Sequence, residues 1–286
     1  MKAEFKNNNV YITDVQDFDL EQTFMCGQCF RWNKTSENSY TGVACGKVLK
    51  ISVLDGVIVL HLTSCDDYYN IWEKYFDLPR NYGEIKKALA ISEVMQKAIS
   101  AGSGIRILRQ DIWETIVSFI ISASNNIPRI KKIITALCEN FGEPLSDGLY
   151  SFPTPDRLRG ITADELAPIR AGFRAKYIAD AVSKIASGEV DINSLDDMDT
   201  IAAKKELLKI NGIGNKVADC ILLFALGRME VFPVDVWIKN TMCKLYPDRC
   251  STILSIRTAG PEIFGSFCGI AQQYLFYYAR ENGGDI

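Results

Sequence analysis

The apolar pattern of the chain changes its period near residue 65, and this change restricts the fold more than any other feature. Before it, five short runs rich in β-branched and aromatic residues are separated by Asn, Ser, Gly and Asp, as in strands joined by turns. The predicted strands are Val10–Thr13, Cys29–Trp32, Tyr40–Val43, Val48–Val53 and Val57–Leu62. Leu54-Asp55-Gly56 predicts a hairpin between the last two strands. We therefore expect an antiparallel sheet with one covered face.

Beyond this point, apolar residues recur at helical spacing. The predicted helices include Asp66–Phe76, Ile112–Ile121, a segment from about Arg129, a segment from about Asp156, and Val236–Tyr246. Asp111-Ile-Trp-Glu114 has the form of a capping box at the start of the second of these helices. The fold class that follows is α+β. We place the boundary near Ser100–Gly104, which gives a sheet domain with helices over residues 1–104 and a helical region over residues 105–286.

The composition excludes several classes of protein. Because His61 is the only histidine, Ser-His-Asp hydrolysis and most zinc catalysis lose their usual base or ligand. Cys26-Gly-Gln-Cys29 is a C-x-x-C pair, but no second pair completes a zinc site, so two small buried residues beside a turn are favoured over a metal or redox half-site. No apolar run approaches the roughly 18–20 residues needed to span a bilayer. We therefore expect a cytoplasmic protein with mostly free thiols and no membrane partner.

A four-residue turn with two glycines, Asn211-Gly-Ile-Gly214, joins two helical segments within about residues 201–226. Gly212 and Gly214 let the backbone turn sharply and expose N–H groups at the positive end of the second helix, which suits a DNA phosphate. A P-loop would need Gly-Lys-Ser/Thr, and a dinucleotide-binding turn would need a preceding strand and a third glycine where Val217 stands. A tight helix–helix connection without any ligand is the alternative.

Lys216 lies in the first turn of the second helix. The positive helix end disfavours an ammonium there, as partial burial would, and an uncharged amine can attack a sugar carbon to form a Schiff base. A solvated lysine that binds phosphate is the alternative. Asp235 is expected to cap the next helix, and its carboxylate could also balance an oxocarbenium-like transition state. Cys220, one turn after Lys216, is by itself more typical of a core.

Asn211–Cys220 followed by Pro233-Val-Asp-Val236 resembles the helix-hairpin-helix (endonuclease III-like) superfamily, and in detail its branch of 8-oxoguanine DNA glycosylases with lyase activity. The other matching segments are Gly27-Gln-Cys-Phe-Arg-Trp32, Ile107-Leu-Arg-Gln-Asp111, Ser124-Asn-Asn-Ile-Pro-Arg129 and Ala271-Gln-Gln-Tyr-Leu-Phe276. These segments cover nearly the whole chain in the expected order, so they are far more specific together than singly. The resemblance implies a TBP-like sheet domain followed by an all-helical glycosylase region.

The resemblance also implies a reaction. The enzyme would flip 8-oxoguanine out of duplex DNA, Lys216 would displace the base at the sugar C1′ with help from Asp235, and the Schiff base would permit β-elimination of the strand. Two alternatives stay open. One is a monofunctional glycosylase for alkylated bases, which would use Asp235 with water and need no lysine. The other is a hairpin module that binds DNA without catalysis.

The pocket for the flipped base is likewise implied by the resemblance. The backbone carbonyl of Gly27 would accept the N7 proton that 8-oxoguanine has and guanine lacks. Gln272 would meet the hydrogen-bonding edge of the base, and Phe276 and Cys220 would sandwich its faces. Gln272 and Phe276 are four residues apart, so a helix would turn both toward one pocket.

A third implication concerns the DNA around the lesion. The gap in the duplex and the orphaned base would be handled by Asn125, Asn126, Arg129, Phe173 and Arg174. A helix cap is the alternative for the two asparagines, and a solvated surface charge is the alternative for the two arginines. The net charge of −3 argues weakly against a nucleic-acid partner. The segments 129–132 and 170–176 would nevertheless form a local basic face.

The chain departs from the family pattern at three positions, and it suggests no cofactor. Ser124, Phe173 and Trp237 stand where the animal enzymes carry asparagine, tyrosine and histidine, so we expect a less strict preference for cytosine opposite the lesion. Four closely spaced cysteines for an iron–sulfur cluster are lacking. By family analogy, a hairpin ion could bind carbonyls of Leu208, Ile210 and Ile213. We expect a monomer, associated with the nucleoid if the source is bacterial, whose partner is double-stranded DNA containing 8-oxoguanine.

Overall fold

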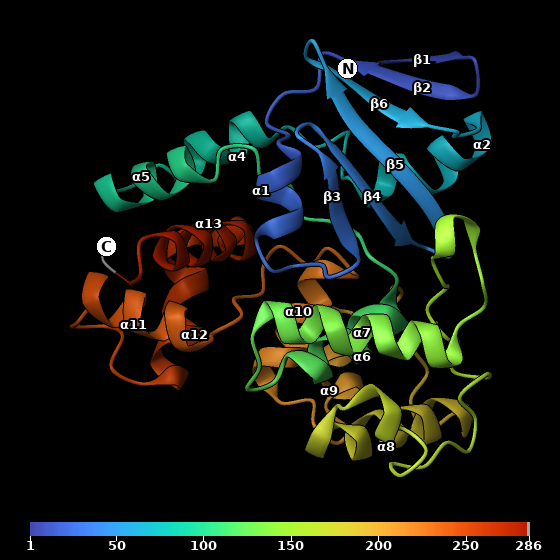
Figure 1. The fold of residues 1–286 in the computed structure, drawn as a ribbon. Coiled ribbons are helices and arrows are strands. Elements are labelled where there is room, and N and C mark those ends of the chain that lie inside the picture. Colours follow the sequence, from blue (N-terminus) through green and yellow to red (C-terminus); the bar gives the residue numbers. More distant parts are fainter. Residues whose placement is uncertain (285–286) are drawn as a thin grey trace.

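The N-terminal part of the chain forms one six-stranded antiparallel sheet in this computed structural model, which describes residues 1–284 (Figure 1). The strand order is β1-β2-β6-β5-β4-β3. The strands are β1 (Lys2–Lys6), β2 (Asn9–Thr13), β3 (Trp32–Ser36), β4 (Ser39–Ala44), β5 (Lys47–Leu54) and β6 (Val57–His61). The predicted antiparallel sheet is thus confirmed. The strand β1 was not predicted, because as an edge strand it is mostly exposed and lacks the apolar alternation of a half-buried strand.

Local chemistry explains both a success and an error in the predicted strands. Asp55 and Gly56 have φ values of +50° and +77°, as a two-residue hairpin turn requires, and Leu54 pairs with Val57. The predicted strand Cys29–Trp32 is wrong except for Trp32. The preceding three residues belong to a loop that follows the short helix α1 (Leu20–Met25), which Asp19 caps by accepting from the Gln22 N–H at 2.8 Å.

An aromatic core covers one face of the sheet. Phe24 of α1 stacks on Trp32 with a centroid distance of 4.2 Å. Trp72 and Phe76 come from the segment predicted as the helix Asp66–Phe76, and they pack in the same cluster. That segment is helical in three pieces, α2 (Cys65–Asp67), the π-helical turn η1 (Tyr68–Trp72) and α3 (Glu73–Tyr75). Cys26 and Cys29 are both buried, as expected.

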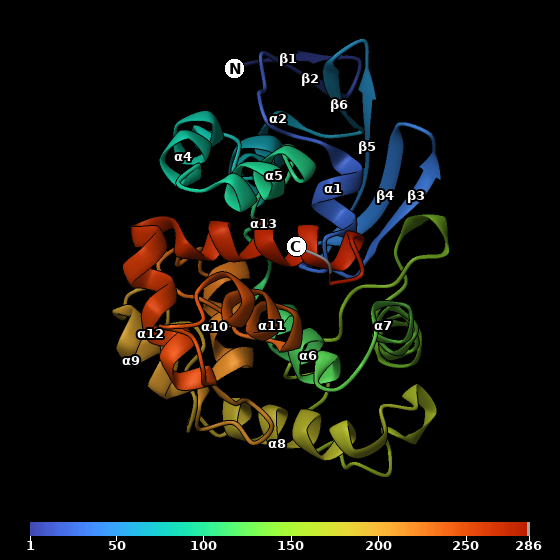
Figure 2. The same ribbon diagram turned by 90° about the vertical axis from the view of Figure 1, so that its left-hand side faces the viewer.

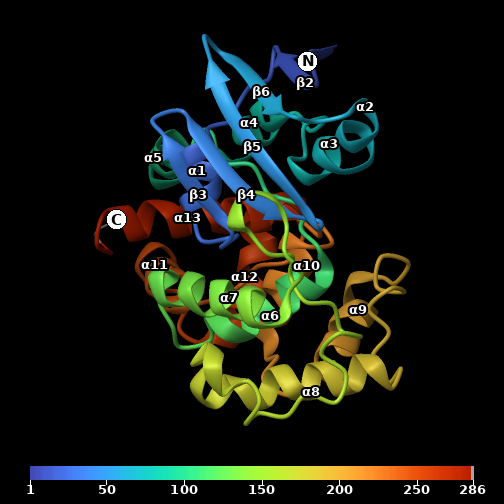
Figure 3. The same ribbon diagram turned by 45° about the vertical axis from the view of Figure 1, so that its right-hand side comes forward.

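The remainder is helical, as predicted. The helices are α4 (Tyr82–Leu89), α5 (Glu93–Ala101), α6 (Ile112–Ser122), α7 (Ile127–Phe141), α8 (Ala175–Ala186), α9 (Thr200–Leu207), α10 (Asn215–Phe224), α11 (Val236–Leu245), α12 (Ile253–Phe264) and α13 (Cys268–Glu281). Short 3-10 turns lie at Ser146–Gly148, Ala167–Ile169, Gly172–Arg174 and Gly265–Phe267. Figure 3 shows α8 at the end of the helical part farthest from the sheet.

Two predictions about the helices need correction. No α-helix begins near Asp156, because the chain there forms turns and Gly160 adopts a φ of +79°; the next α-helix starts at Ala175. The capping box at α6 is only half formed. Asp111 accepts from the Glu114 N–H at 2.8 Å, but the Glu114 carboxylate binds Arg31 instead of turning back to the helix end.

The N-terminal and helical parts share a core across their interface. The helix α5 lies along α13, and Leu89, Met95 and Ala98 belong to the apolar cluster of the helical part (Figure 2). Packing therefore does not follow chain order, and the domain boundary near residue 104 stays a prediction. None of the helices within residues 1–284 is both long and apolar enough to cross a bilayer.

Candidate active site

The glycine turn between α9 and α10 is a helical hairpin, as predicted. Gly212 has a φ of +88°, and a Cβ added there would come within 2.5 Å of Tyr177 in α8. Asn211 fixes the turn to α8, because its backbone N–H and its side-chain amide both donate to the Asp180 carboxylate, at 2.8 and 2.7 Å. Gly214 is the N-cap of α10 and supplies no capping side chain. The first N–H groups of α10 therefore meet no capping side chain of their own helix.

Lys216 is half-buried in the first turn of α10. Its Nζ lies 5.4 Å from the centroid of the Phe119 ring, which comes from α6. Cys220 lies one turn along and is 4% exposed. Burial raises the pKa of the Cys220 thiol to about 11, against the opposing effect of the nearby Lys216 charge. The lysine therefore lies beside two buried side chains, the Phe119 ring and the Cys220 thiol. That its amine is uncharged before the reaction stays a prediction.

Asp235 caps α11, as expected, and it lies near enough to Lys216 for that charge to act on its carboxyl group. Its Oδ1 accepts from the Ile238 N–H at 2.8 Å. Burial raises the pKa of the Asp235 carboxyl, whereas the Ile238 N–H and the positive charge of Lys216 lower it. The first two turns of α10 and the N-cap of α11 thus place a lysine, a buried thiol and a carboxylate within range of one another's charges.

Asp219 is a further part of this arrangement that the sequence did not single out. It is 2% exposed, forms an ion pair with Lys204 of α9, and lies 3.6 Å from the guanidinium of Arg257 in α12. Burial raises the pKa of this carboxyl, and the two cations oppose that effect. A single carboxylate thereby ties three helices together around the hairpin. Its only signal in the sequence was an acidic residue on the apolar face of α10.

Gly27 lies in the loop after α1 and approaches α13. Its φ is +88°, and an added Cβ would lie 3.4 Å from the Phe276 ring and 3.4 Å from Ile127. The backbone conformation therefore favours glycine, while an added Cβ would meet the two side chains at ordinary van der Waals distance. Among the described residues, no donor contacts the Gly27 carbonyl. The structure thus brings together Gly27 and Phe276, two of the residues assigned to the base pocket.

Buried amide side chains hold this loop in place, and sequence reasoning missed them. Gln28 is fully buried; its Nε2 donates to the carbonyls of Thr23 and Arg106, at 2.9 and 2.8 Å. Its Oε1 accepts from the Leu108 N–H at 2.9 Å. Gln273 of α13 donates to the Cys26 carbonyl at 3.0 Å. No local pattern could predict these contacts, because each joins residues brought together only by the fold, except the one to Thr23.

Gln272 and Phe276 lie on α13, as expected, one turn apart. Gln272 is 5% exposed, and its Oε1 has no hydrogen-bond partner among the described residues. Phe276 is half-buried. A buried amide oxygen without a partner is costly in a folded protein. A ligand with a donor on its edge would satisfy this oxygen, and that role of Gln272 stays a prediction.

Residues 125–129 include three residues that the resemblance assigns to the gap in the duplex. Hydrogen bonds to nearby backbone groups hold two of these side chains. Asn126 caps α7 by accepting from the Arg129 N–H at 3.0 Å, so the capping interpretation is correct for this residue. Asn125 donates to the Ile121 carbonyl at 3.0 Å. Arg129 itself is exposed. The predicted DNA contacts of all three residues stay predictions.

Arg174 and Phe173 behave differently from one another. Arg174 is 3% exposed, and its guanidinium donates to the carbonyls of Ala123 and Ser124, so the alternative of a solvated surface charge is wrong. Phe173 is 53% exposed and meets the Tyr177 ring edge to face at 6.2 Å. An exposed aromatic ring on a fixed turn is suited to stacking against bases.

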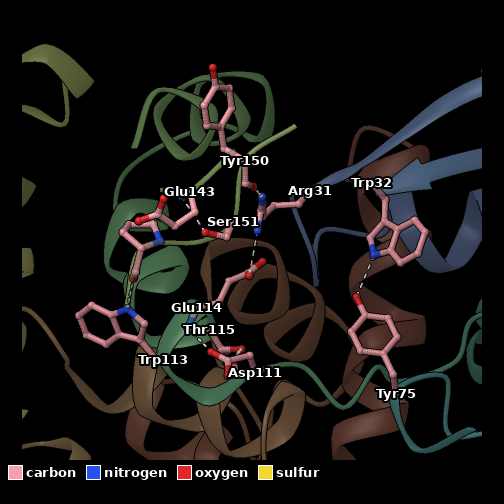
Figure 4. Close-up of polar contacts among 11 residues, drawn as sticks. Arg31, Trp32, Tyr75, Asp111, Trp113, Glu114, Thr115, Glu143, Tyr150 and Ser151 are labelled. Carbon is pink, nitrogen blue, oxygen red and sulfur yellow. Dashed lines mark hydrogen bonds and ion pairs between the residues drawn. The ribbon is translucent and has the colours of Figure 1, made fainter. Parts of the chain in front are cut away.

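A network of polar contacts fixes the segment after Gly27 to the helical part (Figure 4). Arg31 contacts the Glu114 carboxylate at 3.3 Å and donates to the Tyr150 carbonyl. Burial raises the pKa of Glu114 to about 7, although the Arg31 charge opposes this. Trp32 donates from its indole to the Tyr75 hydroxyl at 2.8 Å. These contacts fix both the start of β3 and the N-terminus of α6.

Other features of the structure lie away from these residues. A cavity of about 640 Å³ lies beside the N-terminus of α6, between the β4–β5 turn and α8, and contains none of the predicted site residues. No group of three or more His, Cys, Asp or Glu residues within residues 1–284 is placed to hold a metal ion. The predicted hairpin ion would use backbone carbonyls and stays a prediction.

Comparison with protein families gives two consecutive matches. Residues 10–116 match the N-terminal domain of 8-oxoguanine DNA glycosylase. Residues 117–252 match the HhH-GPD superfamily of base excision DNA repair proteins. The two matches meet within α6, and together they cover the sheet except β1 and the first residue of β2, the hairpin and all of α11.

Individual proteins agree with these matches. An N-glycosylase/DNA lyase of Saccharomyces cerevisiae is 32% identical, over 93% of this chain and 84% of its own length. A probable N-glycosylase/DNA lyase of Methanothermobacter thermautotrophicus is 28% identical, over 94% and 96%. The structure of an 8-oxoguanine glycosylase/lyase of Clostridium acetobutylicum, bound to DNA with cytosine opposite 8-oxoguanine, is 43% identical and superposes with a TM-score of 0.95 over 99% of each chain.

Proposed function

The chain belongs to the 8-oxoguanine DNA glycosylase family within the HhH-GPD superfamily, and from this premise we propose that it excises 8-oxoguanine from double-stranded DNA and then cleaves the strand as a lyase. The single observation that carries the proposal is the position of Lys216. It lies in the first turn of the helix that leaves the glycine turn, half-buried over Phe119, and its charge acts on the Asp235 carboxyl group.

This geometry supports the following chemistry. The Lys216 amine attacks C1′ of the flipped nucleotide, the bond between C1′ and the base breaks, and the base leaves with the electron pair. The fixed carboxylate of Asp235 stabilises the positive charge that develops on the sugar. Loss of a proton from the amine and opening of the sugar ring give a Schiff base. Abstraction of a proton from C2′ then expels the 3′ phosphate by β-elimination.

Recognition of the base uses Gly27, two residues of α13 and Cys220. The free carbonyl of Gly27 accepts the N7 proton of 8-oxoguanine, and guanine offers a lone pair there instead, which repels the carbonyl. Such a mismatch costs about 1–3 kcal/mol for a buried polar pair. The unpartnered Oε1 of Gln272 accepts from the edge of the base. Phe276 and the buried Cys220 take its two faces.

We assign binding of the duplex to the hairpin and to the segments that contain Arg129 and Phe173. The N–H groups at the start of α10, with Gly212 and Gly214, take a phosphate. Phe173 enters the stack from its exposed turn, Arg129 approaches the orphaned base, and Arg174 acts through the Ala123–Ser124 backbone that it binds. Phenylalanine has no hydroxyl to hydrogen-bond the orphaned base, which supports a loose preference for cytosine.

A monofunctional glycosylase for alkylated bases is the principal alternative, and covalent trapping distinguishes the two. We expect borohydride to trap wild-type enzyme on a duplex with 8-oxoguanine opposite cytosine and to trap none of Lys216→Gln. Lys97→Gln, which removes an exposed lysine paired with Glu93, is the matched control and should be trapped like wild type. Absence of an adduct with wild type would contradict the lyase assignment.

The same assay, together with duplex binding, tests the hairpin-only alternative. A module that binds without catalysis would release no base, and Lys216→Gln would leave it unaltered. Repeating the assay with each of the four bases opposite the lesion measures the preference for cytosine.

We further propose that the protein is a monomer in the cytoplasm, associated with the nucleoid if the source is bacterial. The chemistry itself requires none of these properties.

A further inference from the structure

Arg280 carries a buried hydrogen-bond donor without a partner. Its Nη2 donates to the Met25 carbonyl at 2.9 Å, and Nη2 and Nε both approach Glu281, at 3.0 and 3.3 Å. Its Nη1, in contrast, is buried and has no acceptor among the described residues. An unpaired N–H of a charged group is costly in a folded protein and calls for an explanation.

This donor lies at the wall of the base pocket. A Cβ added to Gly27 would be 3.6 Å from Arg280 Nη1. The guanidinium lies 5.7 Å from the centroid of Phe276 and 5.6 Å from that of Tyr277. Those rings compensate the charge in part, but a ring face is a weaker acceptor than an oxygen. The donor beside Gly27 therefore lacks an oxygen acceptor in the described part of the protein.

The spacing of three residues along α13 suits contacts with different sides of one purine. Gln272, Phe276 and Arg280 are spaced four apart, so they lie on one face of the helix. In the proposed function Gln272 meets one edge of the base, Phe276 takes a face, and the Gly27 carbonyl meets N7 at the opposite edge. Arg280, which lies next to Gly27, is then at the N7–C8 edge.

We propose that Arg280 is a specificity-determining residue whose Nη1 donates a hydrogen bond to the C8 oxygen of 8-oxoguanine. This inference rests on the proposed function. Oxidation of guanine changes two neighbouring atoms, because N7 gains a proton and C8 gains an oxygen. The Gly27 carbonyl accepts the new donor, and Arg280 supplies a donor for the new acceptor. Guanine carries a C8–H at that position and leaves Arg280 unpaired.

Two substrates separate this contact from a structural role. In 8-thioguanine the N7 proton is kept while sulfur, a weak acceptor, replaces the C8 oxygen. We expect Arg280→Met to slow single-turnover release of 8-oxoguanine by about 10- to 100-fold, as for loss of a hydrogen bond from a charged donor, and to slow release of 8-thioguanine by less than about threefold. An equal factor for both bases would overturn the proposal.

Gln273→Met is the matched control. It removes the bond from α13 to the Cys26 carbonyl, and so loosens the same loop without touching the proposed contact. It should slow release of both bases by the same factor. If Arg280→Met unfolds at the assay temperature, Arg280→Lys replaces it, because its single nitrogen takes the place of Nη2, which binds Met25, and of Nη1, which is assigned to the base. Arg280→Lys must also slow release of 8-oxoguanine by a larger factor than release of 8-thioguanine. Failure of wild type to release 8-oxoguanine would count against the proposed function itself.

Discussion

The two walls of the proposed base pocket are built in different ways. The hairpin wall, defined by Lys216, Cys220 and Asp235, comes from the first turns of α10 and from the N-cap of α11. The loop wall, defined by Gly27 and Gln28, comes from an irregular segment held by α13 and by residues 106–108. The hairpin wall is thus determined mainly by local helix chemistry, and the loop wall by contacts between distant parts of the chain.

This difference predicts that substitutions on the two walls affect different properties of the enzyme. Substitutions on the hairpin wall should change the rate of the chemistry while leaving the fold intact, because helix starts form locally. Substitutions on the loop wall should change stability and the choice of base, because the loop has no regular structure of its own. The predictions below test this division.

The largest effect is expected for Asp235→Asn. Asparagine caps a helix as well as aspartate does, so the free energy of unfolding should change by less than about 0.5 kcal/mol. Base release should slow by about 100-fold or more, because the stabilising charge is lost. Single-turnover kinetics and thermal unfolding measure the two quantities. A large loss of stability with an unchanged rate would reverse the proposed division.

Asp235 also predicts a pH dependence. Burial raises the pKa of its carboxyl, so on acidification the wild type should lose its carboxylate charge, and with it activity, at a higher pH than an ordinary aspartate would. This acidic limb of the pH–rate profile should be missing in Asp235→Asn. A limb that persists in the variant would assign the titration to another group.

The next effect is expected for Gln28→Ala on the loop wall. The substitution leaves the buried carbonyl of Arg106 and the N–H of Leu108 without partners, so the free energy of unfolding should fall by about 2–4 kcal/mol. Gln96→Ala, at an exposed glutamine, should change it by less than about 0.5 kcal/mol. Denaturant unfolding compares them. Equal stability of the two variants would show that the loop is held by other contacts.

A smaller effect is expected for Gly27→Ala. A left-handed φ costs a residue with a Cβ about 1 kcal/mol, and the methyl group would also narrow the pocket at Phe276. Gly46→Ala is a matched control, because Gly46 has a φ of +73° with nothing within 4 Å of an added Cβ. Both variants should lose similar stability, whereas only Gly27→Ala should weaken binding of 8-oxoguanine DNA, by about tenfold. Similar binding by both would remove Gly27 from the pocket.

The success of the sequence predictions follows the same division. The hairpin, the cap at Asp235 and the start of α10 were predictable, because glycine turns and N-caps depend on a few consecutive residues. The resemblance identified Gly27, but nothing local revealed that Gln28 and Gln273 fix its loop. The helix predicted near Asp156 failed because the pattern there could not show that Gly160 turns the chain with a positive φ.

The buried cysteines around the pocket have a consequence for an enzyme that works on oxidised DNA. Burial raises the pKa of Cys26 and of Cys220 to about 11, and that of Cys29 well above its ordinary value. Peroxide attacks the thiolate and not the thiol, and at neutral pH these three sulfur atoms remain protonated. The three thiols of an enzyme that acts on oxidised DNA are thereby themselves protected against sulfenic acid formation.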